Sequence, residues 1–542
     1  MSMPESLTGK PLTGQVFLLT GASRGIGAAT ALELARRGAV VIGPHRDPGK
    51  DSRAAEVVRQ VEEIGGRMVA PVADVTRPEH RASLLAQIKQ DFGKIDGIIF
   101  NHAGGMEKDL LEASPNYHLE VNGYSKLYLF QEAELARILQ GRSVVIDVPS
   151  LWSTFYHTGI EQLPQYTPVA IGKKLGEQLL KKATRDYNQF DQQAGEHVTF
   201  GSVCGHAIEG TTTIKLLRRM NPEAMQAVEQ TAEGGKLPTI ADMANAIAFM
   251  AEGDFADEDI VFVGVPQIRP GEMPDVLPMY SGETRYVNRL VGLDRQRFVG
   301  YYRVREKDTR FHFDDADGSL DSSSDRAILD VRRNHTIGHF TPEFGISVFP
   351  GHKMIAACEE VAENNFANIT HGEVIDPRLA RIEGPIAFKI PVLPGDRLSI
   401  EIDHPDASLK IGNTEVASIK GLQFEERAWA APRRRGMGFD RLIEAAAQTL
   451  GLAYLFREGV KDVLPLFSGV RGPVEYLRDV YPGEQLEMEA VLAEGEGKNR
   501  FRGDVNIRVD DQVVAKVLGI DCRLSPIRGI GRVISLGRMI LG

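Results

Sequence analysis

Short apolar runs alternate with amphipathic stretches along the first half of the 542-residue chain. Two stretches, residues 28–37 and 51–64, repeat their apolar positions at helical spacing. The apolar runs between them are short and bounded by turn residues, as expected of buried parallel strands; they are residues 16–19, 40–42, 97–100 and 143–146. This alternation predicts an α/β domain with a doubly wound parallel sheet over residues 13–265, preceded by a tail at residues 1–12.

The second half of the chain has a different texture, with β-rich segments around a few helices. Residues 266–283 hold four prolines and two glycines, which indicates a linker. Beyond it, the segment 388–396 returns in similar form at 476–484, after 88 residues. A helix is expected upstream of each copy, at 354–366 and 442–456. The repeat predicts two tandem α+β units of one small fold, at residues 284–425 and 426–542.

Composition narrows the classes of function. The net charge of -11 and the pI near 5.7 argue against a nucleic-acid partner, which would need a basic face. Cys204, Cys358 and Cys522 lie far apart, so no metal site is expected. No apolar run approaches the roughly 18 residues needed to span a bilayer, and no secretion signal is visible at the start. We therefore expect a cytoplasmic protein without a membrane partner.

A glycine-rich turn follows the first expected strand and opens a helix, in the segment Thr20-Gly21-Ala22-Ser23-Arg24-Gly25-Ile26-Gly27. Gly21 allows the tight turn, while Gly25 and Gly27 let the helix N-terminus approach a pyrophosphate. The strand–turn–helix context makes this a dinucleotide-binding motif rather than an isolated glycine triplet.

This motif, together with Asp74-Val75, Asn101 to Gly105, Asn122 and Ser150, resembles the short-chain dehydrogenase/reductase family, and it implies a Rossmann fold. No carboxylate ends the second strand; His45 and Arg46 stand there, which favours a 2′-phosphate and hence NADPH. The cofactor-binding residues that the resemblance implies are Gly21, Ser23, Arg24, Gly25, Ile26, Gly27, Arg46, Asp74, Val75, Asn101, Ala103, Gly104, Lys173 and Ile208.

The catalytic residues that the resemblance implies are spaced unusually. The family commonly places its tyrosine four residues before its lysine, whereas Tyr166 precedes Lys173 by seven. This Tyr-x6-Lys pattern resembles enoyl-ACP reductases, in which a displaced tyrosine donates a hydrogen bond to the enolate that forms on the thioester oxygen. Ser150 and Asn122 also occur in ketoreductases, so both substrates stay open. Tyr156 is expected as a pocket-wall aromatic or a participant.

The tandem units resemble hot-dog folds of the 3-hydroxyacyl-ACP dehydratase type. The first unit supplies Gly338-His339-Phe340, and the second supplies Glu444 and Gln448 on a helix. Each unit lacks the other's contribution, so we expect one composite site. There a neutral imidazole removes the C2 proton and a protonated carboxyl protonates the departing hydroxyl. The alternative is a degenerate pair of purely structural units.

Together these features predict a bifunctional enzyme of fatty-acid or polyketide type. One half reduces a 2-enoyl thioester with NADPH, and the other dehydrates a 3-hydroxyacyl thioester carried by acyl carrier protein or coenzyme A. A 3-ketoacyl reductase joined to the dehydratase is the first alternative, and a non-catalytic acyl-binding assembly subunit is the second. Family resemblance also implies a homo-oligomer.

Overall fold

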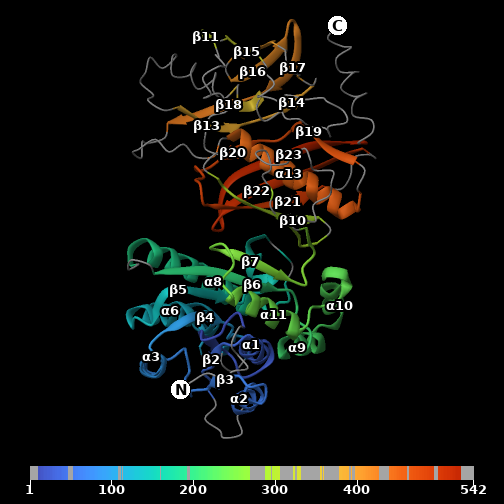
Figure 1. Ribbon diagram of the computed structural model, residues 1–542. Coiled ribbons are helices and arrows are strands. Elements are labelled where there is room, and N and C mark those ends of the chain that lie inside the picture. Colours follow the sequence, from blue (N-terminus) through green and yellow to red (C-terminus); the bar gives the residue numbers. More distant parts are fainter. Residues whose placement is uncertain are drawn as a thin grey trace. The chain divides into compact units, whose positions relative to one another are not determined.

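The computed structural model divides into two compact units, Met1–Pro266 and Gln267–Gly542, which are described separately (Figure 1). The structure describes residues 10–46, 53–107, 111–112, 114–158, 160, 162–191, 196–268, 287, 289–294, 296–305, 321–323, 326–330, 354–356, 358, 377–389, 392, 397–403, 405–426, 437, 439–460, 463–493 and 499–526. None of the helices in these ranges is both long and apolar enough to cross a membrane.

The first unit is built on a seven-stranded sheet in the order β3-β2-β1-β4-β5-β6-β7, and every pairing in it is parallel. The strands are β1 (Val16–Thr20), β2 (Val40–Ile42), β3 (Arg67–Val69), β4 (Ile95–Phe100), β5 (Leu139–Asp147), β6 (His197–Gly205) and β7 (Asp259–Val263). The strand order reverses between β1 and β4, which is where such sheets open a crevice for ligands. The predicted doubly wound sheet is confirmed.

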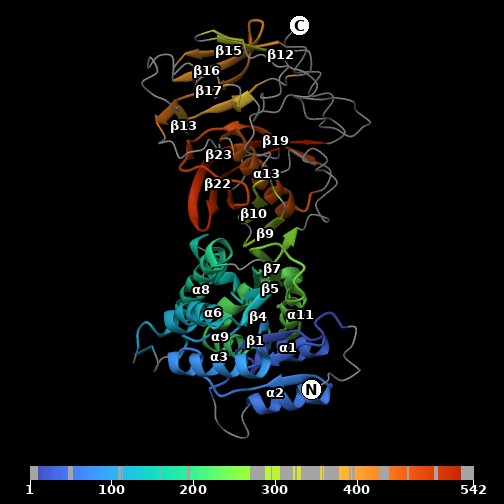
Figure 2. The same cartoon turned by 60° about the vertical axis from the view of Figure 1, so that its left-hand side comes forward.

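Helices cover both faces of this sheet, as Figure 2 shows for α6 and α8 on one side and α1 and α11 on the other. Alternate strand residues point to opposite faces, so Phe17 and Leu19 join one apolar core while Leu18 joins the other. The first core is completed by α1 (Gly25–Arg36), α2 (Arg53–Glu63) and α11 (Ile240–Ala251). The second is completed by α3 (Pro78–Phe92), α6 (Ser125–Leu135) and α8 (Thr167–Asp186).

Helix α8 lies unusually close to the backbone of a neighbouring segment, which consists of α5 (Tyr117–Leu119) and the π-helical turn η2 (Glu120–Tyr124). A Cβ placed on Gly172 would be 2.2 Å from the carbonyl oxygen of His118. A Cβ on Gly176, one turn later, would be 2.2 Å from the carbonyl oxygen of Asn122. Only glycine permits this approach, because a backbone oxygen cannot move aside as a flexible side chain can.

The second unit contains sixteen strands among its described residues, and the pairings between these strands are antiparallel. Its 20-residue helix α13 (Phe439–Glu458) is buried along most of its length and joins the apolar core of this unit. The strands are β8 (Gln267–Ile268), β9 (Arg289–Gly292), β10 (Arg297–Arg303), β11 (Asp321–Ser323), β12 (Arg326–Asp330), β13 (Pro377–Ile382), β14 (Ile386–Phe388), β15 (Arg397–Asp403), β16 (Asp406–Ile411), β17 (Thr414–Ile419), β18 (Leu422–Glu426), β19 (Val463–Val470), β20 (Val474–Tyr476), β21 (Gln485–Leu492), β22 (Arg500–Val509) and β23 (Gln512–Pro526).

The 88-residue repeat reappears in the strand pairing. Strand β14 pairs with β19 through Ile386 opposite Val470, and β20 pairs with β13 through Val474 opposite Ile382. Each partner of one pair lies 88 residues from its counterpart in the other, so the two junctions are reciprocal. That reciprocity is expected when two copies of one unit meet about a local two-fold axis. An antiparallel sheet with one long helix is consistent with a hot-dog fold, whose detailed topology stays a prediction.

Within the segment 266–283, which its composition predicts to be a linker, Gln267–Ile268 form strand β8, which pairs with β9. A strand can form here because proline is tolerated at the start of a strand, so the prolines of this segment do not prevent the backbone pairing of its first residues. Of the first expected helix, 354–366, only residues 354–356 and 358 are described, and these are helical.

The close approach of α8 to η2 leads to a stability prediction. We expect Gly176→Ala to lower the stability of the protein by about 1–3 kcal/mol, because the added methyl group would overlap a backbone oxygen. Thermal and urea unfolding would measure the loss. Lys182→Ala on the same helix is the control, since its side chain is 75% exposed. Equal stability of the two variants would contradict the inferred packing.

Candidate active site

A cavity of about 420 Å³ opens at the carboxyl ends of the central strands of the first unit. Three of the predicted catalytic residues line it: Ser150, Tyr166 and Lys173. They come from different elements, because Ser150 follows β5 while Tyr166 and Lys173 lie at the start and in the first half of α8. The surrounding wall includes Met106, Trp152 and Ile214, so the cavity combines a few polar groups with an apolar lining.

Tyr166 stands at the N-terminal cap position of α8, where its backbone N–H donates to the carbonyl of Leu163 at 2.8 Å. Its side chain is 7% exposed, and its ring packs against Trp152 with the centroids 5.0 Å apart. Burial raises the pKa of the phenol, while a side-chain hydrogen bond with Ser150 opposes that shift. At neutral pH the hydroxyl is therefore protonated and able to donate a hydrogen bond.

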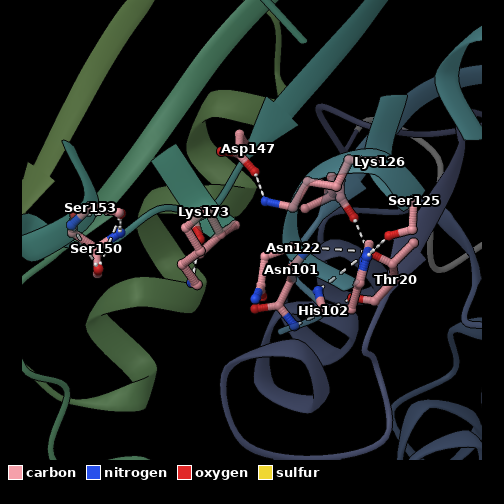
Figure 3. A network of polar contacts seen from close by, with 12 residues as sticks. Thr20, Asn101, His102, Asn122, Ser125, Lys126, Asp147, Ser150, Ser153 and Lys173 are labelled. Carbon is pink, nitrogen blue, oxygen red and sulfur yellow. Dashed lines mark hydrogen bonds and ion pairs between the residues drawn. The ribbon is translucent and has the colours of Figure 1, made fainter. Parts of the chain in front are cut away.

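Ser150 has two roles in the structure. It caps the short helix α7 (Leu151–Thr154), where its Oγ accepts from the backbone N–H of Ser153 at 3.3 Å. The Ser153 hydroxyl returns a bond to the Ser150 backbone, which completes a capping box (Figure 3). The same hydroxyl reaches Tyr166. The cap thus fixes the side chain that faces the phenol.

Lys173 is held by the backbone that follows β5. Its side chain is 8% exposed, and its Nζ donates to the carbonyl oxygen of Val148 at 2.8 Å. Burial lowers the pKa of this ammonium, and the charge of Asp147 opposes the shift. Seven residues correspond to nearly two turns, so Lys173 and Tyr166 lie on the same side of α8, about 10 Å apart along its axis.

The structure does not bring two of the predicted catalytic residues into this cavity. Asn122 in η2 is fully buried, and its amide binds backbone: Nδ2 donates to Gly104 O at 2.7 Å and Oδ1 accepts from Gly104 N at 3.2 Å. It therefore fixes the loop after β4. Tyr156, in the 3₁₀ turn η3 (Tyr156–Thr158), is 39% exposed and does not line the cavity. For both Asn122 and Tyr156, the residue type alone did not indicate where the side chain points.

A second cavity of about 420 Å³ continues from the first over the ends of β1, β2 and β4. Arg24, Ile26, Asn101 and Ala103 line both, so the two form one groove. Among the predicted cofactor residues, the second cavity also has Gly21, Ser23, Gly25, Arg46, Asp74 and Val75, and the first has Gly104, Lys173 and Ile208.

Gly27 lines neither cavity, but it explains how the groove forms. A Cβ on Gly27 would be 2.1 Å from the carbonyl oxygen of Gly21, so a side chain there would push α1 away from the turn after β1. Gly21 itself has φ +69°, and a Cβ there would be 2.9 Å from His102 Cα. Both glycines are required by the backbone, as a pyrophosphate-binding turn demands.

Sequence reasoning missed a polar layer under the site. His102 bridges Thr20 Oγ1 at 2.7 Å and Ser125 Oγ at 2.9 Å, while Lys126 Nζ lies 2.5 Å from Asp147 Oδ1 (Figure 3). Burial lowers the pKa of His102 to about 3, so its ring is neutral. Lys126 stands among apolar neighbours on α6 and Asp147 ends an apolar strand; a charge at such positions was the available signal.

In the second unit, the predicted acid and its partner are adjacent. Glu444 and Gln448 lie one turn apart on α13 and are 8% and 2% exposed. Gln448 Nε2 donates to Glu444 Oε1 at 3.0 Å. The position 88 residues before Glu444 is Ala356, which is helical and carries no acid. His339 lies outside the described residues.

Comparison with known proteins bears on the first unit. The family model described as "Enoyl-(Acyl carrier protein) reductase" matches residues 21–256. Hydroxynaphthalene reductase arp2 of Aspergillus fumigatus is 43% identical over 106 residues, covering 20% of this chain and 37% of that protein. A 1-cyclohexenylcarbonyl-CoA reductase of Streptomyces collinus is 39% identical over 106 residues, with the same two coverages of 20% and 37%.

A solved 7α-hydroxysteroid dehydrogenase, described as complexed with NADH and 7-oxo glycochenodeoxycholic acid, has a TM-score of 0.40 and 23% identity, over 47% of this chain and 94% of that one. The chain thus spans well under two thirds of the two curated relatives named above. Residues 21–256 form a short-chain dehydrogenase/reductase domain. This family uses a nicotinamide dinucleotide.

The neutral His102 leads to a pH prediction. Its pKa of about 3 in the folded state lies below the usual 6.5, so the unfolded chain takes up a proton that the folded chain does not. Wild-type stability should therefore fall as the pH drops from about 6.5 toward about 3. We expect His102→Asn to be less stable near neutral pH but to show a shallower fall over this range in thermal unfolding.

His197→Asn is the control, because it removes an exposed histidine from the same unit. An acid slope that is identical in wild type and His102→Asn would contradict the assignment of a buried neutral ring.

Proposed function

We propose that the first unit is an NADPH-dependent reductase of 2-enoyl thioesters. The observation that supports this most directly is the placement of Tyr166: its hydroxyl meets Ser150 at the cavity, two helical turns ahead of Lys173. A phenol set back from the lysine suits a substrate whose charge develops two carbons from the carbon that accepts hydride. The description of the matching family model and the name of the Streptomyces relative both concern reduction of this kind.

The residues of the chain divide the chemistry among them. When bound, the coenzyme supplies the hydride that adds to Cβ of the substrate. The hydroxyl of Tyr166 donates a hydrogen bond to the thioester oxygen and stabilises the enolate charge there. Ser150 holds that hydroxyl in position, and the ammonium of Lys173 binds the nicotinamide ribose and places positive charge near the phenol. The apolar wall around Trp152 excludes water, which strengthens each of these interactions.

The preference for NADPH is part of the proposal. Residues Pro44, His45 and Arg46 follow β2 and line the second cavity together with Arg24. A carboxylate directly after β2 would bind the ribose 2′-hydroxyl of NADH, whereas basic side chains suit a 2′-phosphate. Of residues 43–46, the positions directly after β2 that the structure describes, those that line the groove carry no acid, and two of them carry a ring nitrogen or a guanidinium.

A 3-ketoacyl thioester is the second candidate substrate. The closeness of the Ser150 hydroxyl to the Tyr166 phenol favours it, because the two hydroxyls together can bind one ketone oxygen. The Aspergillus relative is named as a hydroxynaphthalene reductase, which acts on a different kind of compound.

Substrate competition tests the reductase proposal. The purified protein should oxidise NADPH faster with a crotonyl thioester than with an acetoacetyl thioester, as measured by the loss of the nicotinamide absorbance. Tyr166→Phe should lose about 10²–10³-fold in rate, because the enolate loses its donor. Tyr156→Phe is the matched control and should keep wild-type activity, since that ring lies outside the cavity. Faster reduction of the acetoacetyl thioester would favour the second candidate. If NADPH is oxidised with neither of the two thioesters, both candidates are contradicted.

For the second unit we propose dehydration of 3-hydroxyacyl thioesters, with the acyl chain presented on acyl carrier protein or coenzyme A. The support is Glu444, a carboxyl that is 8% exposed, next to an amide donor and inside an apolar core. Dehydration needs a carboxyl that gives its proton to the leaving hydroxyl, and burial of a carboxyl among apolar side chains favours that protonated form. His339 would remove the C2 proton. Dehydration produces the 2-enoyl thioester that the first unit would reduce, which gives a reason to join the two.

Hydration of a crotonyl thioester, the reverse reaction, tests this part separately because it needs no coenzyme. Glu444→Gln should lower the rate by about 10²–10⁴-fold, since the amide cannot transfer the proton. Glu458→Gln, near the C-terminal end of the same helix and 42% exposed, is the control. If wild type shows no hydration and binds no NADPH, the protein is better described as a non-catalytic acyl-binding subunit.

A further inference from the structure

A fully buried ion pair lies beneath the candidate active site and takes no part in the chemistry described so far (Figure 3). Lys126 Nζ on α6 and Asp147 Oδ1 at the end of β5 are 2.5 Å apart, and both side chains are 0% exposed. Removing two charges from water is costly, and apolar residues of the same volume often give equal or greater stability. A buried pair of this kind therefore points to a role other than stability.

The pair is connected to Lys173 through the backbone. Asp147 directly precedes Val148, whose carbonyl oxygen accepts the hydrogen bond from Lys173 Nζ at 2.8 Å. One short segment thus carries the carboxylate and also fixes the ammonium. Among the described residues, the second carboxylate oxygen of Asp147, Oδ2, has no hydrogen-bond donor. Within the part of the chain that the structure describes, Lys126 is the direct partner of the carboxylate. The negative charge of Asp147 still acts on Lys173, whose pKa it raises.

Lys126 is itself held against the catalytic helix. Its Cδ would lie 3.1 Å from a Cβ on Gly176, so its aliphatic chain passes next to the α8 backbone one turn beyond Lys173. Its location four residues after Asn122 places it on the helix that continues from η2. Lys126 therefore lies beside the place where Gly176 of α8 approaches Asn122 of η2.

We propose that Asp147, held in place by Lys126, is the positioning residue and fixed counter-charge for the ammonium of Lys173. This inference rests on the proposed function, in which Lys173 acts as a cation toward the coenzyme ribose and Tyr166. Asp147 touches neither substrate nor coenzyme and acts through Lys173.

The other ionisable groups around Lys173 leave Asp147 as the effective anion. They are Lys126 on α6, His102 after β4, Cys204 on β6, and Tyr166 and Glu177 on α8. Burial raises the pKa of the Cys204 thiol to about 12 and lowers that of His102 to about 3, so both are neutral near pH 7. Glu177 acts on Lys126 and Cys204 and lies 3.8 Å from Lys174.

Charge removal at the two positions should act in opposite directions. Burial lowers the pKa of Lys173, and the carboxylate of Asp147 raises it again. Without that carboxylate, Lys173 loses its proton at a lower pH. Lys126 and Lys173 repel each other, so removing the charge of Lys126 leaves Asp147 uncompensated and Lys173 keeps its proton to a higher pH.

NADPH affinity as a function of pH tests the inference without reference to the substrate. Coenzyme fluorescence would be titrated from about pH 6 to about pH 10, the range in which a buried lysine loses its proton. In Asp147→Asn the loss of affinity at high pH should begin about one pH unit or more below that of wild type, and in Lys126→Met above it. Lys94→Met removes a lysine from an exposed ion pair at the start of β4 and should leave the profile unchanged.

A double variant, Lys126→Met with Asp147→Asn, addresses the risk that one buried, unpaired charge prevents folding. In the double variant, the pH at which NADPH affinity begins to fall should be lower than in wild type and higher than in Asp147→Asn. Shifts in the same direction for both single variants, or a double variant identical to wild type, would overturn the inference. If these shifts occur but neither thioester is reduced, the proposed substrate is wrong and the role of Asp147 stands. Absence of NADPH binding in wild type would overturn both.

Discussion

The approach of helix α8 to the turn η2 is the contact on which the geometry of the first unit depends. Gly172 and Gly176 let the two backbones touch, and Lys173 lies between these glycines in the sequence. The contact fixes the rotation of α8, and with it the direction of Tyr166 two turns earlier. On the other side of the contact, Asn122 holds the loop after β4. These backbone contacts thus connect α8, which carries Tyr166 and Lys173, with the loop after β4.

The floor of the site is polar although it is fully buried. The Thr20–His102–Ser125 bridge, the Lys126–Asp147 pair and the bond from Lys173 to Val148 follow one another beneath the groove. In low-dielectric surroundings each such group needs a partner, because an isolated charge or donor there is costly. The same surroundings make the field of a fixed charge strong at Lys173. Rigidity and electrostatic control therefore have one physical origin.

The strand pairing of the second unit fits the two tandem units that the sequence predicts. The reciprocal pairing of β14 with β19 and of β20 with β13 preserves a symmetric junction between the copies. The predicted units differ in at least one helical position, since Glu444 has Ala356 as its counterpart 88 residues earlier. A junction held by backbone hydrogen bonds tolerates such changes, because side chains on α13 contribute nothing to the ladder. Divergence of this kind suits one composite site, as proposed.

The sequence by itself determined what local patterns encode. Apolar periodicity predicted the parallel sheet, the spacing of Gly21, Gly25 and Gly27 predicted the groove, and the 88-residue repeat predicted two tandem units of one small fold. Tertiary packing alone decided where side chains point: Ser150 toward Tyr166, Asn122 toward the backbone, Tyr156 toward solvent, and Lys126 onto Asp147. The physical reason is that a residue's neighbours in sequence fix its element, whereas its partner is brought by another element whose approach depends on close packing across the whole domain.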